Sequence, residues 1–167
     1  MALWDGDCTV PLAATEGRLV RAGDSKKGSF IEVISYGVEY MGMTVDVSVR
    51  IDVFDKSRIA RISASELSGK KVRFVTGVNW HEGQRVTLGE GYVSVWGRHP
   101  VDVHGGSVPI GTGMFYSAKE FPEVEKIGDM VRMISRPSDR VSTDVVAAST
   151  REAELNNARR FETFMSK

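Results

Sequence analysis

The chain has 167 residues, which suits one domain, and 41% of them are hydrophobic, enough to close one core of ordinary size. Basic and acidic residues number 22 each, so the charge balance excludes the strongly basic character of a dedicated duplex-binding protein and offers nothing to an anionic membrane. Cys8 is the only cysteine, which excludes an intramolecular disulfide and a cysteine-based zinc site.

No apolar run reaches the length of a transmembrane helix, and the first ten residues, MALWDGDCTV, are acidic where a secretory signal is basic. We therefore expect a protein that is not secreted, makes no membrane contact and is located in the cytoplasm or in a virus particle. Residues 1–17 hold three acidic and no basic residues, residues 18–104 hold thirteen basic and ten acidic, and residues 105–167 hold nine of each. The middle of the chain is therefore mildly basic.

The first strong pattern along the chain is a bent strand followed by a regular one. Residues 29–40 are rich in β-branched and aromatic residues, but their alternation changes phase, and Gly37 marks the expected bulge. In residues 43–55, five apolar residues alternate with polar ones, which predicts a strand with one buried and one wet face. The short link containing Gly42 predicts an antiparallel hairpin between the two.

A third, short strand is expected at residues 58–62, followed by one or two helical turns. The helical turns are indicated by Ser63 and Glu66, whose spacing lets each side chain cap the other's backbone N–H, and by Gly69 at the end of the segment.

Two further strands are expected at residues 72–78 and 92–103, and residues 85–88 are a candidate for pairing with them across a glycine turn. Strand, strand, strand, short helix, strand, strand is an order that resembles the OB-fold, a small, partly open antiparallel barrel. The resemblance covers about residues 18–104 and carries no diagnostic motif, and it implies a protein that binds oligonucleotides or oligosaccharides. A Greek-key sandwich or a viral jelly roll is the alternative, since both contain many short alternating strands.

After a glycine-rich loop expected at residues 104–113, the hydrophobic period changes from two to 3.6. One helix is expected from Pro122 to about residue 136, and a second over residues 143–164. The apolar residues that carry the first helix are Val124, Ile127, Val131 and Ile134. The sequence therefore predicts a mainly β fold, an OB-like small antiparallel barrel followed by C-terminal helices. The domain organisation we expect is an N-terminal arm (1–17), a barrel (18–104), and a loop with a helical segment (105–167).

The apolar side chains of the last helix are expected to mediate self-association, giving a homo-oligomer, or to dock a partner. Packing of the same helix on its own barrel remains the alternative. The side chains concerned are Leu155, Phe161, Phe164 and Met165.

The nearest approach to a metal site is the segment around residue 100, which offers His99, Asp102 and His104. Imidazole and carboxylate suit zinc or iron, but no fourth ligand is evident. The glycines near residue 111 lack the spacing of a phosphate-binding loop. We therefore expect no cofactor and no enzymatic activity.

Aromatic and basic residues occur together in the middle of the chain, and this is the most specific functional pattern. Flat side chains stack on bases and cations neutralise phosphates, as binding of single-stranded nucleic acid requires. The residues expected to bind are Lys70, Lys71, Arg73, Trp80, Arg85, Tyr92, Trp96 and Arg98. Two alternatives stay open for Tyr92 and Trp96, which share one strand face: they are exposed side by side, or both lie in the core.

The sequence thus favours a non-catalytic module that binds single-stranded DNA or RNA on an OB-like barrel and associates through its tail. A viral or phage structural or assembly protein, in which strands and helices make subunit contacts, is the alternative. A small metal-dependent enzyme is the third hypothesis, and it depends on the histidine cluster.

Overall fold

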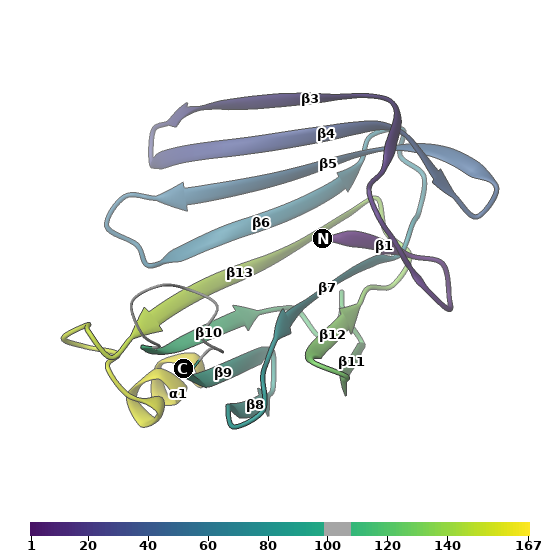
Figure 1. The fold of residues 1–167 in the computed structure, drawn as a ribbon. Helices are drawn as coiled ribbons and strands as arrows, with labels where there is room; N and C mark the ends of the chain where they lie inside the picture. Colours follow the sequence, from purple (N-terminus) through teal and green to yellow (C-terminus); the bar gives the residue numbers. More distant parts are fainter. Residues whose placement is uncertain (99–107) are drawn as a thin grey trace.

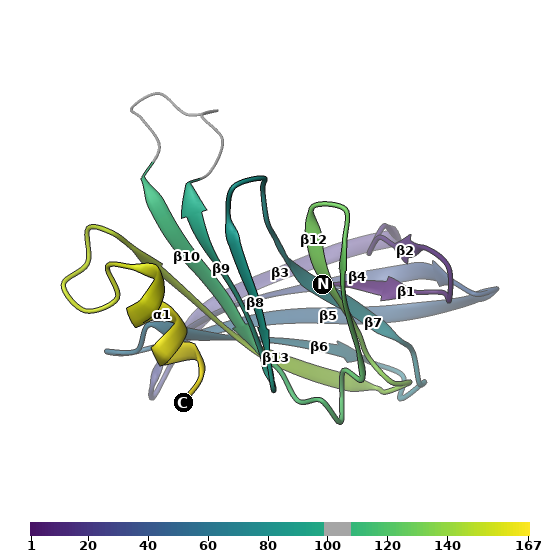
Figure 2. The same cartoon turned by 90° about the horizontal axis from the view of Figure 1, so that it is seen from below.

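The computed structural model describes residues 1–98 and 108–167, and it is mainly β with one short helix near the C-terminus of the described chain (Figure 1). The mainly β class expected from the sequence is confirmed. The strands form two antiparallel sheets, one of eight and one of five strands. The larger sheet curls strongly and leaves an open half-barrel, with the smaller sheet on its concave side (Figures 1 and 2).

The larger sheet runs, edge to edge, through β3 (Ala14–Ser25), β4 (Gly28–Tyr40), β5 (Met43–Phe54), β6 (Ile59–Glu66), β13 (Arg140–Ser149), β10 (Pro109–Phe115), β9 (Tyr92–Arg98) and β8 (Arg85–Gly89). The smaller sheet runs through β11 (Glu123–Ile127), β12 (Met130–Ile134), β7 (Phe74–Asn79), β1 (Ala2–Trp4) and β2 (Thr9–Val10). The helix α1 (Ala158–Met165) packs outside the larger sheet, beside β9 and β10 (Figure 2).

The strands predicted over residues 29–40, 43–55, 58–62 and 72–78 are confirmed, whereas β1, β2 and β3 were not predicted. β4 and β5 form the expected hairpin, with Tyr40 opposite Met43, and β8 pairs with β9 as proposed. The ladder between β4 and β5 shifts between Ser35 and Val38, and Gly37 within that interval has a φ of +70°. Glycine meets this left-handed backbone without the steric cost that a β-carbon imposes, so the expected bulge is present and bends the strand.

The main core lies between the two sheets. Fully buried side chains of the smaller sheet, such as Phe74 and Met133, face Val47 and Val95 of the larger one. The Tyr40 hydroxyl links the larger sheet to the smaller one. It donates to the Trp4 carbonyl oxygen (2.8 Å) and accepts from the Arg73 amide (3.2 Å).

The helix expected over residues 122–136 is wrong, because β11 and β12 form a hairpin there. A two-residue turn begins at Gly128, whose φ of +55° suits a tight hairpin connection. Val131 and Ile134, which a helix would place on one stripe, face opposite sides of β12, Val131 toward the main core and Ile134 toward Trp4. The spacing of three and four residues between these apolar side chains therefore reflects the two faces of a hairpin and not one stripe of a helix.

The second expected helix is largely wrong as well. Within residues 143–164 only Ala158 onward is helical, and the helix ends at Met165. Residues 140–149 form β13, a central strand that pairs with β6 on one side and β10 on the other. The alternation of Val141, Thr143 and Val145 with polar residues is the strand pattern that the helical interpretation overlooked.

Two shorter predictions also need correction. Residues 63–66 belong to β6 and are not helical; Glu66 instead accepts hydrogen bonds from the Ser68 hydroxyl (2.6 Å) and the Lys70 amide (2.6 Å), which holds the following turn. The expected loop over residues 104–113 gives way to β10 from Pro109 onward. Residues 104–107 of that loop and residues 99–103 of the strand expected over 92–103 lie outside the described residues.

Candidate interaction surface

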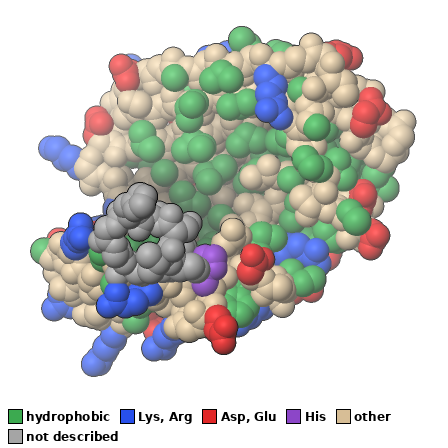
Figure 3. All heavy atoms as spheres, viewed as in Figure 1, with side chains coloured by type: hydrophobic (Ala, Val, Ile, Leu, Met, Phe, Trp, Pro, Cys, Tyr) green, Lys and Arg blue, Asp and Glu red, His purple; other side chains and the backbone are tan. Residues whose placement is uncertain are grey.

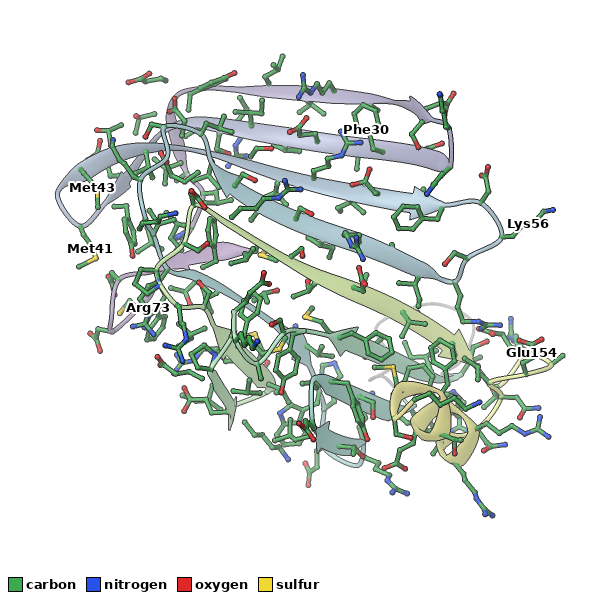
Figure 4. The ribbon with its side chains drawn as sticks, turned by 180° about the vertical axis from the view of Figure 1, so that it is seen from behind. Phe30, Met41, Met43, Lys56, Arg73 and Glu154 are labelled. Atoms are coloured by element: carbon green, nitrogen blue, oxygen red, sulfur yellow. The ribbon has the colours of Figure 1, made fainter. Side chains whose placement is uncertain are left out.

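The cations expected to bind nucleic acid are spread over several elements and are engaged within the chain. Figure 4 shows Arg73 beside the β11–β12 hairpin of the smaller sheet. The contacts are Lys70 Nζ to the Thr44 carbonyl oxygen (2.7 Å), Lys71 to Asp139 (2.7 Å), Arg73 to Glu123 (2.5 Å) and Arg85 to Glu162 (2.8 Å). Arg98 is exposed at the end of β9. The hydrogen bond from Lys71 lowers the pKa of Asp139 below its ordinary value.

The structure settles the orientation of β9. Val93 and Val95 are almost fully buried and face the main core, so Tyr92 and Trp96 lie on the opposite face. That face is covered by α1: the rings of Trp96 and Phe161 are 5.6 Å apart and tilted by 45°. The two aromatics are therefore neither exposed side by side nor part of the main core, but half-buried in a second cluster.

Trp80 belongs to a different cluster from Trp96. It packs against the main core just after β7, and the Lys126 ammonium lies 3.6 Å above its ring. Cation–π contacts of this kind hold the lysine in place. The tryptophans that the sequence grouped into one stacking surface thus take part in separate intramolecular contacts.

The apolar residues of the tail lie against their own chain. Leu155, Phe161 and Met165 are buried against β9, β10 and β13, and Phe164 stacks edge-on with Phe115 at 6.3 Å. This arrangement is the alternative in which the tail covers its own barrel. Asn157 caps the helix by accepting from the Arg160 amide (3.0 Å), which fixes where α1 begins. Self-association or partner docking through the tail stays a prediction.

The metal cluster expected at His99, Asp102 and His104 lies outside the described residues. Within residues 1–98 and 108–167, no three histidine, cysteine or carboxylate side chains gather closely enough to hold a metal ion. The described helix is too short and too polar to cross a membrane.

The feature that the sequence did not predict is an uncovered half of the larger sheet. Along β5, Val45 and Val47 are buried, but Ile51 is 37% and Val53 49% exposed, although all four face the same side. The reason is that the ends of β3 to β6 project past β1 and β7 of the smaller sheet (Figure 1). Apolar side chains that the alternating pattern directs inward therefore meet solvent.

Cross-strand pairing joins these side chains into rows. Ala22, Ile31, Ile51 and Ile62 lie opposite one another on β3, β4, β5 and β6, and a second row runs through Val20 and its partners. We call the whole group the open apolar face, and Figure 3 shows it as a broad hydrophobic area above a hollow. It consists of Val20, Ala22, Ile31, Val33, Val49, Ile51, Val53, Ala60 and Ile62.

A groove of about 660 Å³ borders the open apolar face, where the larger sheet passes under β7. Its lining is mostly apolar and comes from Ala60, Ile62, Val78, Met114 and Val145, among others. Arg58 stands at its margin, but its guanidinium already donates to Glu152 (2.6 Å) and Glu154 (2.9 Å). The groove therefore extends the open apolar face toward the main core.

The convex side of β4, β5 and β6 carries polar side chains that are paired with one another. Arg50 lies 3.7 Å above the ring of Phe30 and pairs with Asp52 (2.7 Å), and Arg61 pairs with Asp144 (2.8 Å). Phe30 lies on β4 in Figure 4, which views this side. The convex side of these strands is therefore suited to contact with solvent, whereas the open apolar face on the concave side is not.

Glu32, on the convex side, provides a test of this network. The residue is buried, with 8% of its surface exposed. Its carboxylate accepts from Arg21 Nε (2.5 Å) and the Ser48 hydroxyl (2.5 Å), and these bonds lower the pKa of Glu32. A lowered pKa adds stability above the unfolded-state pKa, about 4.3, and this contribution disappears as pH falls through the folded-state value. We expect Glu32→Gln to cost about 1 kcal/mol at pH 7 and clearly less near pH 3.

Urea unfolding of the wild type and of Glu32→Gln, each at pH 7 and near pH 3, measures this loss of stability. Glu90→Gln, an exposed change in the β8–β9 turn, serves as the control and should cost little at either pH. An equal loss for Glu32→Gln at both pH values would contradict the assignment of the lowered pKa to these bonds.

No protein-family model matches this chain, and no curated protein matches it in sequence.

Proposed function

We propose that this chain is a non-catalytic structural or assembly protein whose copies associate through the open apolar face. The observation that carries the proposal is the exposure of Val20 (59%), Val53 (49%) and Ile31 (44%) within one contiguous sheet face. Large contiguous apolar areas on a folded chain mark interaction sites, because burying them releases about 25 cal/mol per Å².

The chemistry of the face favours a protein over a small ligand. Small-molecule sites enclose most of the ligand and add a few convergent polar groups for orientation. The open apolar face extends across four strands, β3 to β6, and Arg58, the cation at the margin of the bordering groove, is already held by two carboxylates. An extended aliphatic surface of this kind fits another apolar protein surface.

Self-association is favoured by the absence of net charge. With 22 basic and 22 acidic residues, copies of the chain do not repel one another, and a charge near zero promotes association. Closed two-fold assembly is the commonest arrangement for such proteins.

The proposal is tested by placing charge on the face. We expect the wild-type protein to have a mass above its 18.4 kDa monomer in sedimentation experiments, and Ile31→Lys with Val53→Lys to be monomeric. Both side chains are exposed in the single chain, so lysine can reach water there without unfolding the domain.

The matched control is Leu67→Lys with Ile127→Lys, which adds the same charge at apolar side chains that are 48% and 45% exposed elsewhere. It should assemble as the wild type does. A wild-type protein that stays monomeric at every concentration, or a control that dissociates as readily as the test variant, would overturn the proposal.

Single-stranded nucleic-acid binding stays a prediction. The intramolecular partners of Lys71, Arg73 and Arg85 and the covering of Trp96 by α1 give it less support than the open apolar face gives to assembly.

A further inference from the structure

The strand that ends the larger sheet beside the open apolar face is long and forms the edge of that sheet. β3 has twelve residues and pairs with β4, and within the described residues no strand lies on its outer side (Figure 1). Its ladder is regular from Gly17 to Ser25 and the strand holds no proline. The opposite edge, β8, has five residues. Long regular edges offer unpaired backbone N–H and C=O groups to a further strand.

We propose that two copies of this chain pair through β3, antiparallel and about a two-fold axis, so that their larger sheets become one. This inference rests on the proposed function and states where the copies meet. β3 carries one exposed apolar side chain on each face, Leu19 (46% exposed) and Val20 (59% exposed). A strand that stays at a solvated edge does not need such side chains. Pairing would remove part of both side chains from water and satisfy the backbone.

The side chains of β3 select one register. When Arg21 lies on the two-fold axis, Arg18 of each copy lies opposite Asp24 of the other, and Val20 lies opposite Ala22. On the other face, Leu19 lies opposite Gly23. Two opposite-charge pairs and two apolar pairs therefore form at once, and pairs of both kinds stabilise antiparallel ladders.

Neighbouring registers are worse. With Val20 on the axis, Glu16 faces Asp24 twice, and like charges directly opposite are destabilising. With Ala22 on the axis, Val20 faces Asp24, and with Leu19 on the axis, Val20 faces Arg18. These registers replace favourable pairs with like charges or with apolar–charged contacts.

The intramolecular contacts of the charged side chains on β3 are compatible with this pairing. Arg21, which would meet its own copy, is neutralised by Glu32 in each chain. Arg18 donates one N–H to the Leu12 carbonyl oxygen (2.6 Å), which leaves the other donors of its guanidinium. Asp24 accepts one bond from Ser29 (2.8 Å) and keeps further acceptor capacity.

The symmetry also explains the open apolar face. A two-fold axis perpendicular to the sheet at β3 keeps the concave sides of both copies on the same side. The two half-barrels then continue one curl, and both open apolar faces line a shared interior. Val20 lies next to the axis and Ile31 one strand away from it, so these two members of the open apolar face come nearest to the partner copy.

A charge exchange tests the register. Arg18→Asp alone and Asp24→Arg alone each put like charges opposite each other at both symmetry-related pairs. We expect each to raise the dimer dissociation constant about tenfold or more. The double variant restores opposite charges with the wild-type net charge, and it should return the dissociation constant to near the wild-type value. Arg151→Asp, in the exposed turn after β13, is the control for charge alone and should dimerise normally.

Hydrogen exchange of the dimer supplies the second readout. Amides of residues 17–25 should exchange more slowly in the wild type than in Arg18→Asp, and circular dichroism should show that both are folded. If the wild type associates but neither single exchange weakens it, or the double variant fails to recover, the β3 pairing is wrong while association through the open apolar face stands. If the wild type never associates, both proposals fail.

Discussion

Replacing Phe74 with alanine is expected to lower the free energy of unfolding by about 4 kcal/mol. Phe74 is completely buried on β7, opposite Leu3 of β1, in the layer between the two sheets. Because β7 is held between β1 and β12, the strands cannot close in on the space that the ring leaves. With domain stabilities of about 5–15 kcal/mol, the variant would keep a small margin of stability.

Urea unfolding followed by circular dichroism measures this loss. The control is Ile127→Ala on β11, where the side chain is 45% exposed and its removal should cost about 0.5 kcal/mol or less. Equal losses at the two positions would mean that the main core does not lie between these sheets.

The strands from β4 to β9 could be predicted because alternation and turn residues within each segment indicate them, whereas β1, β2 and β3 were not predicted. Period-two alternation from Val45 to Val53 defines β5 by itself, and Gly37 marks the bulge of β4. The prediction for the second half was wrong because the spacing of its apolar residues fits a helix as well as a hairpin. Gly128 followed by aspartate is a recognised two-residue hairpin signal, and weighing it against the helical period would have identified β11 and β12.

The surfaces could not be predicted from local patterns. Val47 and Val53 are equivalent in the alternation, but only Val47 is covered, because coverage depends on where β1 and β7 lie, and these strands come from other parts of the chain. The same holds for Trp96: its face of β9 is covered by α1, about sixty residues later in the sequence. Position along a strand predicts the face of a residue but not what lies on that face.

Replacing Trp96 with alanine is expected to lower the free energy of unfolding by about 3 kcal/mol. The indole packs on Phe161 of α1 and lies directly over Gly111 of β10, where a β-carbon would come within 2.5 Å of the ring. Alanine would leave both neighbours without this contact and loosen the helix from the sheet. Trp96→Phe keeps an aromatic ring above Gly111 and should cost less than half as much.

Titration of the same variants with a single-stranded oligonucleotide separates the two functional hypotheses. If the indole serves packing, Trp96→Ala should be destabilised and neither it nor the wild type should show salt-sensitive oligonucleotide binding. If it serves base stacking, Trp96→Ala should keep its stability and weaken binding by about 1–3 kcal/mol. The second outcome would require α1 to leave the sheet when nucleic acid binds, because the helix occupies the face on which a base would stack. Oligonucleotide-dependent exposure of α1 to proteolysis would then accompany binding, and nucleic-acid binding would replace assembly as the function of this chain.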